Sequence, residues 1–193
     1  MMKTVLPLLL AIAVALGGGA VSVWMMLEEA PAIDALRIGP WTAFPNAGTP
    51  QADPYSRARF VREGGIPLGK AEGIAFTATR DSNGQALRRE CAYRLSGTLP
   101  VSRLWTLYAA DLSGMPLPPT GRRAPALHSQ MILQEPEGIE ITASHYPAPR
   151  NWLALSGQGS MQLVLTLFDT PVSTSAGIDQ ISMPDIIRTG CDA

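Results

Sequence analysis

The sequence predicts an all-β domain, an antiparallel jelly-roll-like sandwich with one short helix, preceded by an N-terminal transmembrane helix. Three observations support this prediction. Residues 4–27 contain no charged side chain. Beyond them, several segments alternate apolar and polar residues, as half-buried strands do. The 18 glycines and 17 prolines are spread along the chain, which indicates many turns with short strands between them.

The N-terminal run is long enough to cross a membrane. As a helix, its roughly 24 residues would span about 36 Å, against about 30 Å for the hydrocarbon core of a bilayer. Trp24 falls where an interfacial aromatic residue is expected. We therefore expect residues 1–28 to be an uncleaved anchor that crosses the membrane through residues 4–27.

A cleaved signal peptide is the alternative for the same stretch. Lys3 would be its basic start, residues 5–16 its apolar core, and the small residues up to Ala20 its cleavage site. The apolar run continues to Leu27, which favours the anchor. Both alternatives export the rest of the chain.

The charges that flank the run predict its orientation. Lys3 precedes it and Glu28 follows it, which favours a cytoplasmic N-terminus. We expect a single-pass inner-membrane protein with a periplasmic C-terminal domain. Cleavage near Ala20 would instead give a secreted or periplasmic protein.

About 165 residues follow the anchor, enough for one domain with its own core. Residues 29–52 carry four prolines and are expected to be a linker and first extended segment, with a short strand at 38–44. Residues 53–193 should form the domain. Asp53 suits a helix N-cap and Pro54 a first helical position, so a helix of about ten residues should end at the glycines 64 and 65.

Alternation of apolar and polar residues predicts six strands in this domain. The last is apolar on both faces and should be central in its sheet. Three turns place an acid three residues before a glycine, so we expect hairpins there with antiparallel neighbours. The predicted strands are 74–79, 90–95, 104–110, 127–134, 139–146 and 161–168, and the turns are 81–84, 111–114 and 135–138.

The two cysteines, Cys91 and Cys191, predict a disulfide. An even number of cysteines in an exported domain favours pairing, and this bridge would tie the C-terminal tail to a central strand. Two unpaired buried thiols are the alternative. Neither cysteine has a neighbouring histidine to act as a base, so neither is expected to be a nucleophile.

Several functional classes find no support in the composition. The net charge is −1, without a basic block, so nucleic acid is not an expected partner. His128 and His145 are the only histidines, and no HxH or HExxH spacing is present. We predict no metal, no cofactor and no catalytic residue. His145 continues an apolar strand face and is expected to be a core or edge histidine.

Five side chains are candidates for lining a pocket. They are His128, His145, Arg150, Trp152 and Arg57. Trp152 could instead be a core aromatic, since aromatics at strand positions usually are. Arg57 lies on the predicted helix and could bind an anion, although a solvated helix face paired with Glu63 or Glu72 is the simpler interpretation.

An ordered set of segments resembles a known family. These are 38–41, 53–58, 68–69 with Glu72 and Phe76, 81–87, CAYRLSG at 91–97, 104–107, 151–153 and 184–191. Together they resemble the bacterial family catalogued as domain of unknown function 1214 (DUF1214), over most of residues 39–191. The resemblance implies a β-rich, jelly-roll-like and often exported domain without an established activity. Longer members carry a companion domain before this one, and here a membrane segment takes its place.

These observations favour a binding or assembly module of the cell envelope. The expected partner is an envelope protein, with the companion domain of longer family members as a candidate. The alternative is an enzyme that acts on an envelope carbohydrate, lipid or small molecule. Its site would be a cleft of the sandwich near His128, His145 or Arg150.

Overall fold

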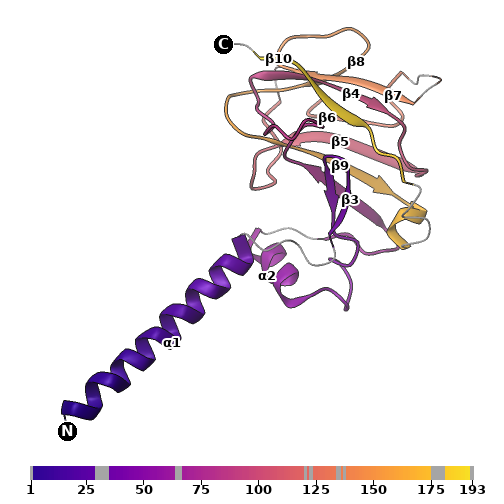
Figure 1. The fold of residues 1–193 in the computed structure, drawn as a ribbon. Helices are drawn as coiled ribbons and strands as arrows, with labels where there is room; N and C mark the ends of the chain where they lie inside the picture. The colour runs from indigo at the N-terminus through magenta and orange to yellow at the C-terminus, as the bar shows by residue number, and fades with distance from the viewer. Residues whose placement is uncertain are drawn as a thin grey trace.

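The computed structural model describes residues 2–28, 35–63, 67–119, 121, 124–133, 136, 138–174 and 181–191. A long N-terminal helix, α1, leads to a short helix, α2, and two packed β-sheets (Figure 1). The six-stranded sheet lies nearer α2, and the four-stranded sheet forms the far layer (Figure 1). The predicted β-rich class is therefore confirmed.

Helix α1 spans Met2–Glu28 and projects away from the sheets (Figure 1). Within it, Val5–Met25 has a mean hydropathy of 2.2 and none of its side chains is buried. No protein core covers its apolar surface within the described residues, and it is long enough to cross a bilayer. An anchor and a signal sequence both meet this description.

Helix α2 spans Pro54–Glu63, as predicted. The side-chain Oδ1 of Asp53 accepts a hydrogen bond from the backbone N–H of Ser56 at 3.0 Å, which satisfies one of the free donors at the helix start. Pro54 takes the first helical position, where its missing N–H costs nothing. Of the glycines expected to end the helix, 64 and 65 lie outside the described residues.

The six-stranded sheet has the order β1-β2-β3-β9-β5-β6 and is antiparallel throughout. Its central strand β9 pairs with β3 and β5 and is buried on both faces, as its composition predicts. A 3-10 helix, Pro171–Thr174, follows β9. The strands are β1 Leu36–Ile38, β2 Trp41–Ala43, β3 Gly73–Ala78, β5 Leu104–Ala110, β6 Ala126–His128 and β9 Gln162–Phe168.

The four-stranded sheet has the order β10-β4-β7-β8. Its strands are β4 Cys91–Gly97, β7 Ile139–Ser144, β8 Asn151–Ala154 and β10 Asp185–Cys191. β7 and β8 are parallel, although only residues 145–150 connect them. A parallel pair usually needs a crossover of a dozen or more residues, so this connection is unusually short.

The core lies between the two sheets. Alternate residues of each strand point into it, including the fully buried Phe76, Tyr93, Leu107 and Leu165. Burial of such a side chain contributes about 1.5–3 kcal/mol. At one end, the indole N–H of Trp41 donates to the backbone oxygen of Pro184 at 2.7 Å, which joins the β1–β2 hairpin to the segment before β10.

The disulfide between Cys91 and Cys191 is formed, as predicted. The two residues are directly opposite each other in the paired strands β4 and β10, with Cα atoms 3.9 Å apart. The bridge thus fixes the last described residue of β10 to the start of β4.

Several element predictions are wrong in detail. The strand expected at 127–134 ends at His128, because the chain turns there and the N–H of Met131 bonds back to the His128 oxygen at 3.0 Å. The segment 38–44 is a hairpin rather than one strand, because Gly39 has a positive φ of 55° and breaks the extended chain. β8 and β10 lie in stretches where no strand was expected.

The hairpin prediction holds at one of three turns. Residues 111–114 form a tight turn at the start of the connection 111–125 between β5 and β6, and these two strands do pair antiparallel. Residues 81–84 form the expected tight turn, but the strands on either side, β3 and β4, belong to different sheets. β6 and β7, around residues 135–138, are also in different sheets. An acid and a glycine predict the turn itself and do not determine which sheet the next strand joins.

Candidate functional site

The structure separates the two histidines. His128 ends β6, at the edge of the six-stranded sheet, and its Nδ1 accepts the backbone N–H of Gln130 at 3.3 Å. His145 follows β7 of the four-stranded sheet and is exposed, with its ring edge-on to that of Tyr146 at 5.2 Å. His145 is therefore not a core histidine, because β7 ends one residue before it.

Trp152 is close to the end of β7. Its indole N–H donates to the backbone oxygen and to the hydroxyl of Ser144, at 3.1 and 3.0 Å. It lies on the outer face of the four-stranded sheet, since its neighbour Leu153 is buried in the core. Trp152 thus bonds to the residue that precedes His145 in the chain.

Arg150 and Arg57 lie elsewhere. Because β8 runs parallel to β7, with Asn151 beside Ile141, Arg150 is at the opposite end of these strands from His145. Arg57 is on α2, where its guanidinium donates to the backbone oxygen of Pro50. Of the five candidates, His145 and Trp152 lie at the same end of β7, because Trp152 bonds to Ser144, the residue before His145.

A hollow of about 330 Å³ lies beside the disulfide, with His145, Tyr146, Glu90 and Thr189 among its lining residues. The pKa of Glu90 is lowered by its own backbone N–H and that of Gly159, so this carboxylate is ionised at neutral pH. It is already engaged by Arg88. Such a carboxylate is poorly suited to give up a proton.

No metal centre is found in the described part of the chain. None of its His, Cys, Asp and Glu side chains form a group of three or more that could hold an ion. The two histidines also belong to different sheets.

A second cavity, of about 340 Å³, lies on the outer face of the six-stranded sheet. We call it the α2 groove. Its floor is made by side chains that point away from the core, and its walls by α2 and the loops on either side of it. The main apolar side chains are Phe44, Phe60, Leu68, Ala75, Tyr108 and Val164.

The α2 groove is built by the packing of α2 over the sheet. Phe60 of α2 and Phe44, just after β2, meet edge to face with ring centroids 6.2 Å apart. Under this cover, the outward side chains of β9 are buried: Val164 is 7% exposed and Thr166 8%. The outer face of the central strand is thus part of a small second core, with a cavity left inside it.

A tight turn forms one rim of the groove. Oδ1 of Asp111 accepts the backbone N–H groups of Ser113 and Met115 at 2.9 and 3.0 Å, and the Ser113 hydroxyl at 2.6 Å. The Asp111 backbone oxygen accepts from the side chain of Gln162 in β9 at 2.8 Å. The three bonds to Oδ1, first that of the Ser113 hydroxyl, lower the pKa of Asp111. The turn holds Leu112 and Met115 out in solvent, 62% and 65% exposed.

The groove is apolar, with a few hydrogen-bonding groups. None of its lining residues is charged. The pKa of Tyr108 is raised by burial, so its hydroxyl is protonated at neutral pH. Thr77, Ser113 and Gln162 supply further polar atoms. This composition matches ligand pockets in general, which are mainly apolar and have volumes of about 300–1,000 Å³.

The five candidates predicted from the sequence include none of these lining residues. One signal was present: the segment 161–168 is apolar on both faces, which a strand needs only if both faces of its sheet are covered. We used that signal to place the strand centrally. It also indicates that something packs on the outer face at Val164, and α2 is the nearest candidate in the chain.

The protein is a two-sheet β domain that follows an apolar N-terminal helix and carries a groove on the outer face of one sheet. The chain belongs to the family described as protein of unknown function DUF1214, whose model matches residues 72–172. The match runs from the loop before β3 to the 3-10 helix after β9. It contains the strands that form the floor of the groove.

One solved structure shares the fold, and a second gives a weaker match. The VPA0106 protein from Vibrio parahaemolyticus superimposes with a TM-score of 0.62 at 15% identity, over 90% of this chain and 43% of that chain. An uncharacterized protein from Burkholderia cenocepacia gives a TM-score of 0.42 at 15% identity, over 93% of this chain and 42% of that chain. This chain thus spans less than half the length of either protein. No curated protein matches it.

Proposed function

We propose that this protein is a single-pass inner-membrane protein that displays a binding module in the periplasm, with the α2 groove as its binding site. The groove is the observation that carries the proposal: it is an uncharged cavity of ligand-pocket size on an outer sheet face. The disulfide supports the location, because such bonds persist in oxidising compartments. Helix α1 supports the anchoring.

The test is photo-crosslinking of the full-length protein in its native membrane. A photoreactive amino acid replaces Leu112, at the groove rim, and in a matched control it replaces Val101. Both side chains are exposed and apolar, and they lie at opposite ends of β5. We expect the photoreactive residue at position 112 to crosslink to a bound molecule and the one at position 101 not to. Equal labelling at the two positions, or none, would overturn the proposal.

An envelope protein is a second class of partner, supported by one observation. In the VPA0106 protein this fold accounts for less than half of a longer chain. A separately encoded companion domain could therefore supply the remainder here. Crosslinking and pull-down from solubilised membranes tests this idea. When the captured protein is used as bait in turn, it should recover this protein. If it does not, an envelope protein is not the partner.

The enzyme alternative gains no support from the candidate residues. His128 and His145 belong to different sheets, and Arg150 lies at the far end of β7 and β8 from His145. We therefore propose binding rather than catalysis at the α2 groove.

A further inference from the structure

The position of the α2 groove relative to the membrane restricts what it can bind. Helix α2 forms one wall of the groove and contacts α1. Figure 1 places α2 between the C-terminal end of α1 and the six-stranded sheet. Helix α1 ends at Glu28 and β1 begins at Leu36, a gap of about seven residues that reaches at most about 25 Å when extended. If α1 spans the bilayer, the groove lies close to its surface.

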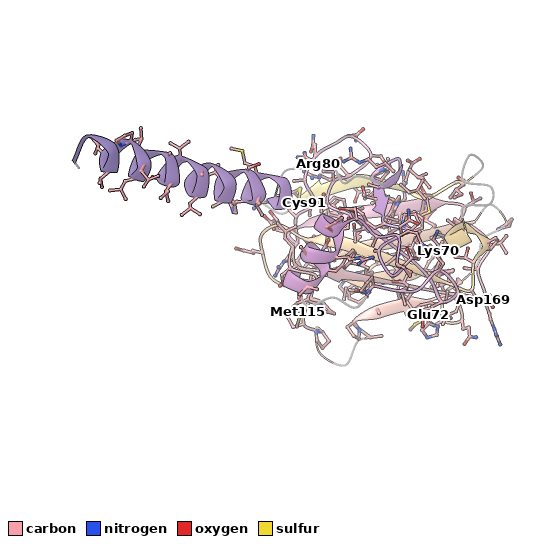
Figure 2. All side chains as sticks on the ribbon, turned by 90° about the horizontal axis from the view of Figure 1, so that it is seen from below. Lys70, Glu72, Arg80, Cys91, Met115 and Asp169 are labelled. Carbon is pink, nitrogen blue, oxygen red and sulfur yellow. A yellow bond between two sulfur atoms is a disulfide. The ribbon has the colours of Figure 1, made fainter. Side chains whose placement is uncertain are left out.

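The side chains beside the groove suit that location. Leu112 and Met115 protrude from the rim turn, and Val61 protrudes from α2 with 81% exposure. In the view from below, Figure 2 shows α2 in front of the strands with Met115 at its edge. Exposed apolar side chains next to an apolar cavity are typical of a site of contact with a membrane or an apolar partner.

The position on the sheet argues against an extended peptide. The groove lies on the face of β3, β9 and β5, and each of these strands already has a hydrogen-bonded neighbour on both sides. Within the groove only residues 73–75 of β3 lie beyond the pairing with β2, so an extended peptide would find at most this short row of backbone donors and acceptors. A buried peptide backbone without such partners would lose several hydrogen bonds to water. A hydrocarbon chain needs none.

From this geometry we propose that the α2 groove takes up one acyl chain of a phospholipid from the membrane that α1 spans. The chain enters past Leu112 and Met115 and lies over Ala75 and Val164. The Tyr108 hydroxyl has no hydrogen-bond partner within the described residues and is available to the ester carbonyl of the lipid. This inference rests on the proposed function, since it names the ligand of the same site.

The test uses full-length protein reconstituted in phospholipid vesicles. The probe is a phospholipid with a diazirine on one acyl chain; a free fatty acid with the same group is tested in parallel. After irradiation, the labelled residues are mapped by mass spectrometry. We expect the phospholipid to label groove residues as well as α1. Labelling of α1 alone would overturn the inference, and labelling of the groove by the fatty acid alone would overturn its assignment to a membrane lipid.

Two variants and a control make the result specific. Ala75→Trp should fill the groove and abolish labelling there, with α1 labelling unchanged. Ala154→Trp places the same bulk on the outer face of the four-stranded sheet and should leave groove labelling unchanged. Leu112→Asn, at an exposed position that folding does not require, should reduce groove labelling several-fold. If wild-type and Leu112→Asn proteins label equally, entry past this rim is wrong.

The outcome is distinguishable from failure of the proposed function. A crosslink from position 112 to a protein, with no lipid labelling of the groove, would retain the binding module and remove the acyl chain. If neither a crosslink from position 112 nor lipid labelling of the groove is found, the α2 groove is not a binding site.

Discussion

Oδ2 of Asp81 lies 3.3 Å from Nε of Arg188, which joins the turn after β3 to strand β10 of the other sheet. Asp81 is fully buried and Arg188 about four-fifths buried. The other oxygen of Asp81 accepts the N–H groups of Asn83 and Gln85 at 3.1 and 2.9 Å. The Arg188 guanidinium also lies 5.5 Å from the centroid of the Tyr93 ring. One carboxylate thus orders the turn and holds the two sheets together.

Replacement of Asp81 should therefore destabilise the whole domain. Asp81→Ala leaves Arg188 without its ion-pair partner and the turn without its acceptor, and removal of one member of a buried pair costs about 3–5 kcal/mol. We expect the lower end of this range because Arg188 is partly exposed. Urea denaturation of the variant measures the loss.

Asp185→Ala is the matched control. Asp185 is exposed and accepts a single side-chain bond from Ser82, at 3.0 Å. Its replacement should change the free energy of unfolding by less than about 0.5 kcal/mol. Equal losses in the two variants would mean that the ion pair has no special role.

Loss of the disulfide should weaken the domain to a similar extent. The bridge joins residues separated by 100 positions, and the chain-entropy estimate for such a loop is about 4.7 kcal/mol, with native bridges usually worth about 2–5 kcal/mol. We expect the Cys91→Ala, Cys191→Ala double variant to lose stability in this range. Thiol tagging of native protein should find no free thiol before reduction and two afterwards. Two tags without reductant would contradict the disulfide.

The groove rim should loosen in acid. The folded state lowers the pKa of Asp111 below its ordinary value of 3.8, first through the Ser113 hydroxyl. The ionised carboxylate therefore contributes stability that is present above pH 3.8 and is lost as the pH falls through the lower folded-state pKa. Hydrogen exchange at Ser113 and Met115, whose N–H groups bond to this carboxylate, should accelerate over that interval.

Asp111→Asn separates titration from the turn itself. The amide oxygen still accepts the two N–H groups but does not ionise, so exchange at Ser113 and Met115 should lose its acid dependence beyond the intrinsic chemical rate. An unchanged acid dependence in this variant would assign the effect to another group.

The local elements were predictable because their signals are local. The Asp53 N-cap, the alternation in β3 and β4 and the both-face apolarity of β9 each depend on neighbours in the sequence. The β10 strand escaped prediction because its pairing depends on a distant partner, and the parallel β8 because so short a crossover from β7 is unusual. For β10, Ile186 is buried only because β4 and the turn at 81–84 happen to lie beside it.

The candidate site was hard to predict for the same reason. The α2 groove brings together Phe44, Phe60 and Tyr108, which are widely spaced in the sequence and individually look like core aromatics. The histidines attracted attention because their chemistry is recognisable from residue type alone. Their separation into two sheets follows from topology, which the turn residues do not encode.

The N-terminus of the mature protein tests whether α1 is an anchor. The small residues that would form a cleavage site, Gly18 to Ala20, lie inside one continuous helix that runs on to Glu28. Cleavage after Ala20 would also leave an apolar stub, 21–27, on the domain. We therefore expect intact-mass measurement of protein extracted from membranes to give a chain that begins at Met1 or Met2. A mass that corresponds to a start at Val21 would make α1 a signal peptide. The domain would then not be anchored at a bilayer, and the proposal of a membrane acyl chain in the α2 groove would be wrong.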